Sequence, residues 1–206
     1  MKIEVFHQAA IKLMGEKIIY FDPYNIQEEY HDADYIFITH DHYDHYDEKS
    51  IKNITKNTTK LIVPECLKTI ENDLVVEPNK DYEIDGITFH TISSYNVNKT
   101  FHPKEKEYVG YNILLENEYY YIMGDTDRTP ETDMVKTDYC FVPIGGTYTM
   151  NTEEAADYIN YIHPKQAIPI HYGSIVGDES LGEVFKKKIK DDIKVTIYIK
   201  KEENLW

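Results

Sequence analysis

The chain has 206 residues, of which 41% are hydrophobic and 29% are charged, a balance that is typical of a soluble folded protein. Its 37 Asp and Glu residues outnumber the 22 Lys and Arg residues, and the resulting net charge of −15 argues against a nucleic-acid partner. The one dense basic run, residues 186–190, follows an apolar helical pattern and is better explained as a solvated helix face. The length predicts one domain over residues 1–206.

The start of the chain and the cysteines bear on the compartment. The first residues alternate polar and apolar side chains, and they lack the apolar run of a signal peptide. No apolar stretch is long enough for a membrane helix, so no membrane partner is expected. Cys66 and Cys140 lie far apart in sequence and are expected to be free thiols. These features predict a cytoplasmic protein.

In chain order, strand-forming segments outnumber helical ones. Alternating or continuous apolar patterns predict strands at residues 3–6, 11–14, 17–21, 35–38, 60–63, 82–84, 87–92, 111–115, 119–123, 139–144, 167–170 and 195–199. Helices are predicted after Asp47 to about residue 55, from Pro64, after the capping pair Asn151 and Glu154, and over residues 180–189. The pattern predicts two sheets with helices on their outer faces, of either the α/β or the α+β class.

A histidine-rich segment follows the apolar run of residues 35–38 directly. Residues 39–45 read THDHYDH, so His40, His42, Asp44 and His45 offer imidazole nitrogens and a carboxylate on one loop. His40 and His42 alternate in an extended chain and point to one side, whereas Asp44 and His45 can turn toward a second metal ion. The alternative is a chance histidine-rich surface loop. Four donors directly after a buried strand favour a metal site.

This H-x-H-x-D-H order resembles the signature of the metallo-β-lactamase superfamily, and its later motifs follow in order. Residues 124–127 (GDTD) resemble the motif whose Asp bridges two metals, and residues 169–173 (PIHYG) resemble the motif whose His binds the second metal. Residues 19–23 (IYFDP) resemble the opening strand and turn of the branch related to the L-ascorbate-6-phosphate lactonases. The resemblance spans nearly the whole chain. It implies an α+β fold, the αββα sandwich of two mixed β-sheets flanked by helices.

One expected ligand is missing from its usual place. The superfamily supplies a third His to the first metal just after a mid-chain strand, but residues 93–96 (SSYN) contain none. His90 lies inside the strand pattern, where an ordinary strand residue is expected. We therefore choose His102, in the loop before residues 109–113, and treat residues 95–100 as a local insertion. Asn96 is the alternative donor.

The resemblance implies a ligand set and a chemistry. The first metal takes His40, His42 and His102, the second takes Asp44, His45 and His171, and Asp125 bridges the two. The cofactors are then two divalent metal ions, with zinc expected and manganese or iron as alternatives. A hydroxide shared by the metals attacks the substrate, and Asp44 orients this hydroxide or accepts its proton.

Three further residues are candidates for substrate binding: Asn96, Lys99 and Tyr148, each on a loop predicted to surround the site. Lys99 has the charge to hold a phosphate or a carboxylate. Near the site, His7 is expected to approach the metals or to form a hydrogen bond behind them, and Asp22 is expected to cap a turn or orient a ligand.

The predicted function is dinuclear metal-dependent hydrolysis of a small ester, lactone or phosphorylated substrate. One alternative is a phosphodiesterase or nuclease of the ribonuclease Z type, which a basic groove leading to the metals would favour. Another is a metal-binding regulator with little catalysis, which a closed metal shell would favour. Residues 205–206 (LW) suggest a homo-oligomer contact or, alternatively, a self-packed tail.

Overall fold

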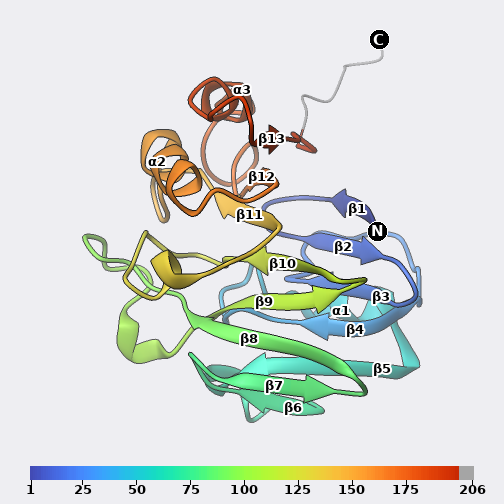
Figure 1. Cartoon of the computed structure of the whole chain (residues 1–206). Helices are drawn as coiled ribbons and strands as arrows, with labels where there is room; N and C mark the ends of the chain where they lie inside the picture. The colour runs from blue at the N-terminus through green and yellow to red at the C-terminus, as the bar shows by residue number, and fades with distance from the viewer. Residues whose placement is uncertain (200–206) are drawn as a thin grey trace.

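The computed structural model describes residues 1–199, which form two β-sheets lying face to face (Figure 1). Six strands follow one another across the first sheet: β1 (Lys2–Val5), β2 (Ile11–Met14), β3 (Ile18–Phe21), β4 (Ala33–Phe37), β5 (Thr55–Pro64) and β6 (Leu74–Val76). Seven strands, in the spatial order β13 to β7, make the second sheet: β7 (Asp81–Ile84), β8 (Ile87–Ser93), β9 (Val109–Leu115), β10 (Glu118–Ile122), β11 (Tyr139–Pro143), β12 (Gln166–Ile170) and β13 (Lys194–Val195).

Both sheets are mixed, and each is antiparallel in its first part and parallel in its second. Strands β1 to β3 pair antiparallel and β3 to β6 pair parallel, and the same change occurs at β10 in the second sheet. The predicted hairpin at Asp85 and Gly86 joins β7 to β8, with φ angles of 49° and 85° that a tight two-residue hairpin turn requires.

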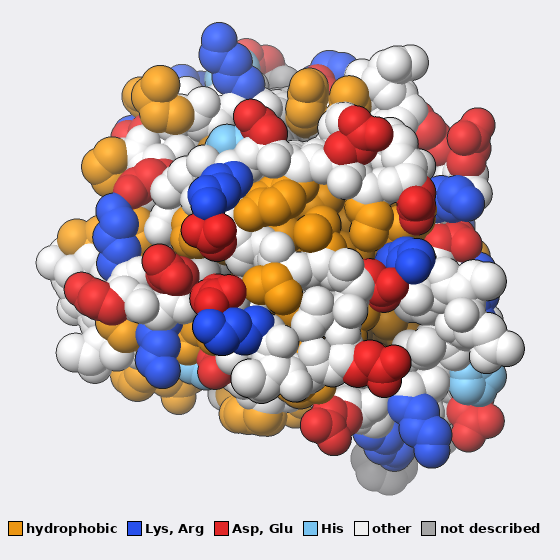
Figure 2. Space-filling view, turned by 90° about the horizontal axis from the view of Figure 1, so that it is seen from below, with side chains coloured by type: hydrophobic (Ala, Val, Ile, Leu, Met, Phe, Trp, Pro, Cys, Tyr) orange, Lys and Arg blue, Asp and Glu red, His pale blue; other side chains and the backbone are white. Residues whose placement is uncertain are grey.

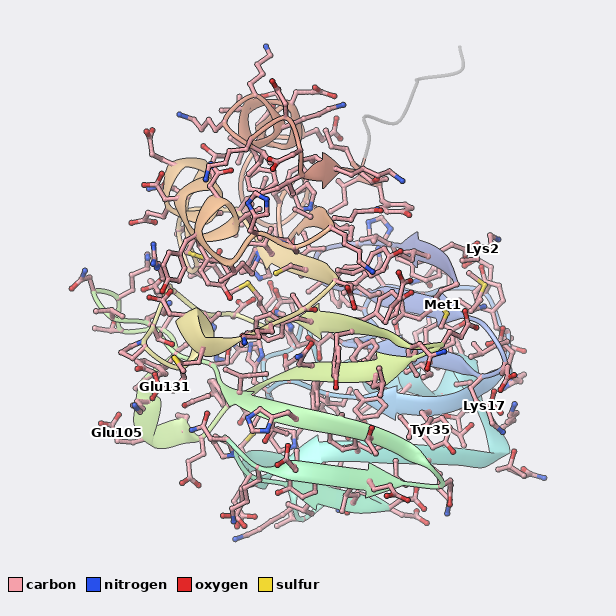
Figure 3. All side chains as sticks on the ribbon, viewed as in Figure 1. Met1, Lys2, Lys17, Tyr35, Glu105 and Glu131 are labelled. Carbon is pink, nitrogen blue, oxygen red and sulfur yellow. The ribbon has the colours of Figure 1, made fainter. Side chains whose placement is uncertain are left out.

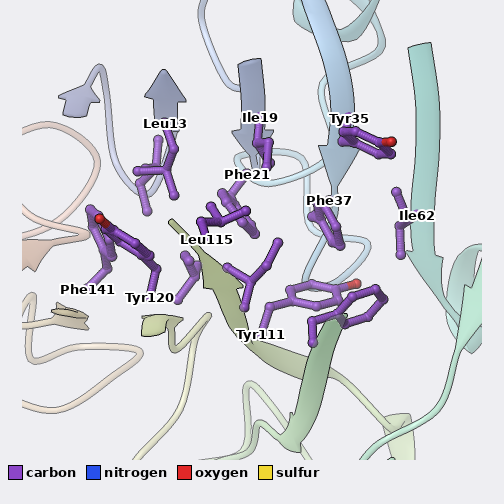
Figure 4. Packing of buried hydrophobic residues seen from close by; sticks show 14 of the residues in the cluster. Leu13, Ile19, Phe21, Tyr35, Phe37, Ile62, Tyr111, Leu115, Tyr120 and Phe141 are labelled. Atoms are coloured by element: carbon purple, nitrogen blue, oxygen red, sulfur yellow. The ribbon is translucent and has the colours of Figure 1, made fainter. Parts of the chain in front are cut away.

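The main hydrophobic core lies between the two sheets. Alternate side chains of each strand point inward, so Phe21 and Phe37 from the first sheet meet Tyr111 and Phe89 from the second (Figure 4). The Phe37 ring lies 5.1 Å from the Tyr111 ring and 5.2 Å from the Phe89 ring, both edge to face. This arrangement of aromatic pairs favours one fixed packing of sheet on sheet.

Helices cover the outer faces. On the first sheet lies α1 (Glu48–Ile54), which Asp47 caps through its side chain. Helices α2 (Thr152–Ile162) and α3 (Leu181–Lys186) pack on the second sheet (Figure 1). The predicted capping box at the start of α2 is present. The structure is therefore the αββα sandwich of two mixed sheets that the sequence predicted.

Several predicted element boundaries were wrong. The helix expected from Pro64 is a single 3-10 turn, η1 (Glu65–Leu67), like η2 (Lys104–Lys106) and η3 (Thr132–Met134). The last helix and the last strand are shorter than predicted, and the edge strand β6 was not predicted. Parallel pairing with β5 makes β6, a contact that a three-residue apolar run cannot reveal by periodicity. Residues 205–206 lie outside the described residues.

Among residues 1–199, no helix has both the length and the apolar character needed to cross a membrane.

Candidate metal centre

The predicted ligands follow strands that end at one edge of the sandwich. His40 and His45 lie on the loop after β4, Asp125 lies just after β10, and His171 follows β12 immediately. Because β10, β11 and β12 run parallel, Asp125 and His171 emerge at the same edge. Gly124 makes this approach close: its φ is +65°, and a Cβ on it would lie 3.1 Å from the Cβ of Thr39.

Three imidazoles form a first cluster. His40, His42 and His102 each offer one nitrogen, and these nitrogens lie within 4.8 Å of one another. His102 reaches this position from the long loop between β8 and β9, where its Nε2 is 3.3 Å from Nδ1 of His42. The same Nε2 is 3.3 Å from Oδ2 of Asp125, so this cluster adjoins the next.

A second cluster contains Asp44, His45 and His171, whose donor atoms also lie within 4.8 Å of one another. Asp125 stands between the two clusters. Its Oδ2 is 3.0 Å from Nε2 of His171, and its Oδ1 is 3.4 Å from Nε2 of His45. Asp125 also groups with His40 and His45 at metal-binding distance, as a carboxylate shared by two ions would.

Unsatisfied buried atoms test whether these residues fit metal ions. Among the described residues, Nε2 of His40, His45 and His171 and Oδ1 of Asp125 are buried without a hydrogen-bond partner. Buried polar atoms are rarely left in this state, and a cation at each cluster would satisfy all four. Imidazole nitrogens and carboxylate oxygens are the donors that zinc, manganese and iron accept. The residues therefore fit a pair of divalent metal ions.

Burial and neighbouring charges divide the imidazoles into two kinds. Burial, assisted by the imidazole of His45, holds the pKa of His40 well below its usual range. Burial likewise lowers the pKa of His102 to about 4, although Asp125 opposes this shift. At His171 burial also acts to lower the pKa, but Asp125 and Asp44 outweigh it and raise the value to about 9.

The second cluster is thus bound together by charge. Burial disfavours the ionised form of Asp125, yet His171 and His45 hold the pKa of its carboxyl well below the usual range. Burial opposes ionisation of Asp44 as well, and the neighbouring imidazoles of His171 and His45 bring its pKa to about 2. At His45 the carboxylates of Asp125 and Asp22 overcome burial and raise the pKa well above the ordinary value.

Hydrogen bonds from behind fix the orientation of two ligands. Asp22 is fully buried and accepts from Nδ1 of His45 at 2.8 Å, as well as from the backbone N–H and the hydroxyl of Thr39, both at 2.7 Å. Oδ1 of Asn96 is 2.9 Å from Nδ1 of His102. Because these oxygens hold the Nδ1 atoms of His45 and His102, each imidazole is fixed with its Nε2 toward the centre.

Gln8 is a site residue that the sequence analysis did not identify. Its side-chain Nε2 donates to Asp44 at 3.1 Å, its Oε1 accepts from the hydroxyl of Ser174 at 2.8 Å, and its carbonyl accepts from the N–H of His171 at 2.8 Å. His7, which was expected near the metals, is exposed. The turn between β1 and β2 buries the side chain one residue later, and the alternation of residues 1–7 contains no signal of that turn.

Three residues of the centre have a left-handed backbone, with φ of 56° at Gln8, 45° at Asp22 and 58° at His171. Such a conformation costs a non-glycine residue about 1–3 kcal/mol, so the surrounding contacts must enforce it. Backbone strain of this kind collects at functional sites and is consistent with side chains held in fixed positions.

A cavity of about 500 Å³ opens beside the clusters. Five predicted ligands line it: His42, Asp44, His102, Asp125 and His171. The rest of the lining consists of Asp41 and the side chains of Tyr43, Phe101, Tyr148 and Ile175. Its volume lies within the range of small-molecule sites. The ligand clusters are therefore accessible to a small substrate.

Comparison with known proteins agrees with this geometry. A family model described as the beta-lactamase superfamily domain matches residues 2–171. The chain belongs to the metallo-β-lactamase superfamily. A UPF0173 protein of Pyrococcus abyssi is 31% identical to it over 92% of this chain and 91% of the relative. A UPF0173 metal-dependent hydrolase of Methanosphaera stadtmanae is 29% identical over 94% and 93% of the two chains.

Among solved structures, a protein described as a metal-dependent hydrolase of Parabacteroides distasonis superposes with a TM-score of 0.83 and 28% identity. The match covers 96% of this chain and 93% of that one. The hydrolase class expected from the sequence is confirmed at this level, since relatives that match nearly full length carry that name.

The structure brings all seven predicted ligands together, and their role as ligands stays a prediction. Of the predicted substrate-binding residues, only Tyr148 lines the cavity. Nζ of Lys99 instead pairs with Oδ1 of Asp127 at 2.7 Å. Asn96 is buried and contacts His102 and the carbonyl of Tyr148. Sequence alone cannot show which residues this insertion contacts, because Asp127 lies 28 residues from Lys99 and Tyr148 lies 52 residues from Asn96.

Proposed function

We propose that the chain hydrolyses a small ester or lactone with two divalent metal ions, held by the two clusters and shared by Asp125. One observation carries this proposal. Buried nitrogen and oxygen atoms without hydrogen-bond partners converge beside a cavity that is large enough for a small molecule and that Asp125 and His171 line. A structural metal site is normally closed by its protein ligands, whereas a cavity beside the ligands favours catalysis.

When bound, the two metal ions would lower the pKa of a water molecule to about 7 and stabilise negative charge on the substrate oxygen. Asp44 remains ionised because its pKa is about 2, and it lines the cavity. Gln8 holds this carboxylate, so Asp44 is placed to accept a hydrogen bond from the attacking water and orient it. The water oxygen adds to the carbonyl carbon, the C–O bond of the ester breaks, and the leaving oxygen takes the proton that the water gives up.

The charge pattern supports a small molecule over a nucleic acid. Among the described residues that line the cavity there is no Lys or Arg, so a phosphate backbone would meet no basic groove there. On the face shown in Figure 2, Lys and Arg side chains are interspersed with Asp and Glu and form no continuous basic track. The net charge of −15 acts in the same direction.

Metal content per chain tests the proposal most directly. We expect two metal ions per chain in gently purified protein, and a loss of at least one in the His102→Ala variant. His90→Ala is the matched control, because His90 lies on β8 but pairs with Asp81 at 2.8 Å instead of facing the centre. Hydrolysis of a panel of esters and lactones should fall in the first variant and persist in the second.

Unchanged metal content in His102→Ala would refute the ligand assignment. A parent chain that binds two metals but hydrolyses no member of the panel, and no phosphodiester, would favour the metal-binding regulator instead.

A further inference from the structure

Apolar side chains surround the mouth of the cavity although water reaches them. Tyr43 is 66% exposed, Phe101 46% and Ile175 39%, and all three line the cavity together with Tyr148. We call these four residues the apolar rim. Exposed apolar side chains that are grouped into a patch, instead of scattered singly, mark surfaces where a ligand or a partner binds.

The rim is joined directly to the ligand clusters. Phe101 precedes His102, and Tyr43 stands between His42 and Asp44. The Phe101 and Tyr148 rings pack edge to face with their centres 4.6 Å apart. A substrate whose carbonyl reaches the metal ligands therefore has its neighbouring group against these rings.

The loop that carries Phe101 is held in place before any substrate arrives. The carboxylate of Asp127 accepts hydrogen bonds from Nζ of Lys99 at 2.7 Å and from the backbone N–H of Val97 at 2.9 Å. Near the two ends of the loop, the Tyr95 hydroxyl and the Lys104 ammonium both donate hydrogen bonds to the carboxylate of Glu131 (labelled in Figure 3). A preformed rim loses little conformational entropy on binding.

These contacts also remove the one cation that the sequence offered to an anionic substrate. Lys99 is committed to Asp127, and within residues 1–199 Asp41 is the one charged lining residue outside the predicted ligand set. Its Oδ1 accepts from the hydroxyl of Tyr108 at 2.8 Å. A phosphate or carboxylate beside the reactive carbonyl would thus meet aromatic rings and a carboxylate.

We propose that the apolar rim selects neutral esters or lactones that carry an aromatic group next to the reactive carbonyl or ring. This inference rests on the proposed hydrolytic function and names its substrate class. The phosphorylated substrates implied by the resemblance to the lactonase branch are then excluded. Lys99 serves to anchor the loop.

Three γ-lactones with the same ring test the rim: γ-butyrolactone, its γ-phenyl derivative and its γ-carboxylate derivative. In the metal-loaded parent we expect kcat/KM for the phenyl lactone to exceed the unsubstituted one by about tenfold or more, the usual gain from filling an apolar pocket. The carboxylate lactone should be the poorest substrate. Phe101→Ala should lower the ratio of kcat/KM for the phenyl lactone to kcat/KM for γ-butyrolactone by most of this factor.

Tyr119→Ala is the matched control, because Tyr119 is 43% exposed on β10 and does not line this cavity. It should change none of the three rates. A preference for the carboxylate lactone, or a phenyl preference that survives Phe101→Ala, would overturn the rim and leave the hydrolase intact.

If no lactone is hydrolysed, binding separates the two proposals. The measurement is a calorimetric titration of the metal-loaded chain with the phenyl lactone. If the parent binds this lactone and Phe101→Ala does not, the rim stands and only the lactonase activity is refuted. Absence of that binding would overturn the rim as well.

Discussion

The two ligand clusters differ more in charge than in geometry. Each offers three donors within 4.8 Å. In the first, burial keeps His40 and His102 neutral, with the pKa of His102 at about 4. In the second, the carboxylates of Asp125 and Asp44 raise the pKa of His171 to about 9, so this imidazole is charged near neutral pH.

The same residue types therefore differ between the clusters in their protonation state before a cation binds. Neutral imidazoles hold free lone pairs and accept a cation without losing protons. Ion-paired imidazoles stabilise the empty cluster, because each charge has a partner, but a cation must displace their protons. Asp125 lies between the clusters, 3.3 Å from Nε2 of His102 and 3.0 Å from Nε2 of His171, and contributes most to the raised pKa of His171.

The largest expected effect comes from removing that shared carboxylate. Asp125→Asn should lower metal content from two ions per chain to one or none and reduce kcat/KM by about a thousandfold, since several kcal/mol of charge stabilisation depend on the metals. Metal analysis and hydrolysis assays measure both. Asp133→Asn, which alters a carboxylate paired with Arg128 away from the centre, should change neither. Full metal content in Asp125→Asn would show that the clusters do not share it.

A smaller effect should separate the clusters. Asn96 orients His102 of the first cluster, whereas Gln8 holds Asp44 of the second. Asn96→Ala should lower the affinity for the metal ion at the first cluster by about 10–100-fold, and Gln8→Ala should do the same at the second cluster. Each variant should leave the affinity at the other cluster nearly unchanged. Stepwise titration with a chelating dye resolves the two affinities. Asn96→Asp, which keeps the acceptor oxygen, should restore most of the loss. Equal weakening of both metals in either variant would contradict two separately supported clusters.

The smallest effect is a difference in pH dependence. Since the pKa of His171 is raised from 6.5 to about 9, its proton is present below that pH and must leave when a metal binds. Affinity at the second cluster should therefore increase with pH, by up to about tenfold per unit for each proton released, between about pH 7 and pH 9. His102 is already neutral there, so the first affinity should stay nearly constant. Dye competition across this range measures both slopes, and equal slopes would refute the charge difference.

Much of the fold was readable from local patterns. Asp47 and the Asn151–Glu154 pair predicted two helix starts, and the Asp85-Gly86 pair predicted a hairpin. These signals act within a few residues, so tertiary contacts do not alter them. The short strands β6 and β13 and the short helix α3 depend instead on neighbours in the sandwich, and their boundaries were missed or wrong.

By itself, the sequence determined the family, the αββα sandwich and most of the residues that converge at the candidate centre, because donors placed directly after strands need only the strands to be aligned. His102 is the exception, since it reaches the centre from the long loop between β8 and β9. The tertiary structure alone decided the roles of Gln8, Asn96 and Lys99. Gln8 and Lys99 bind residues 36 and 28 positions away, and Asn96 binds the carbonyl of Tyr148 as well as His102 on its own loop. Hydrogen bonds of this kind leave no periodic trace in the chain. The same loop contacts pair Lys99 with Asp127 and leave Tyr43, Phe101 and Ile175 exposed beside the cavity.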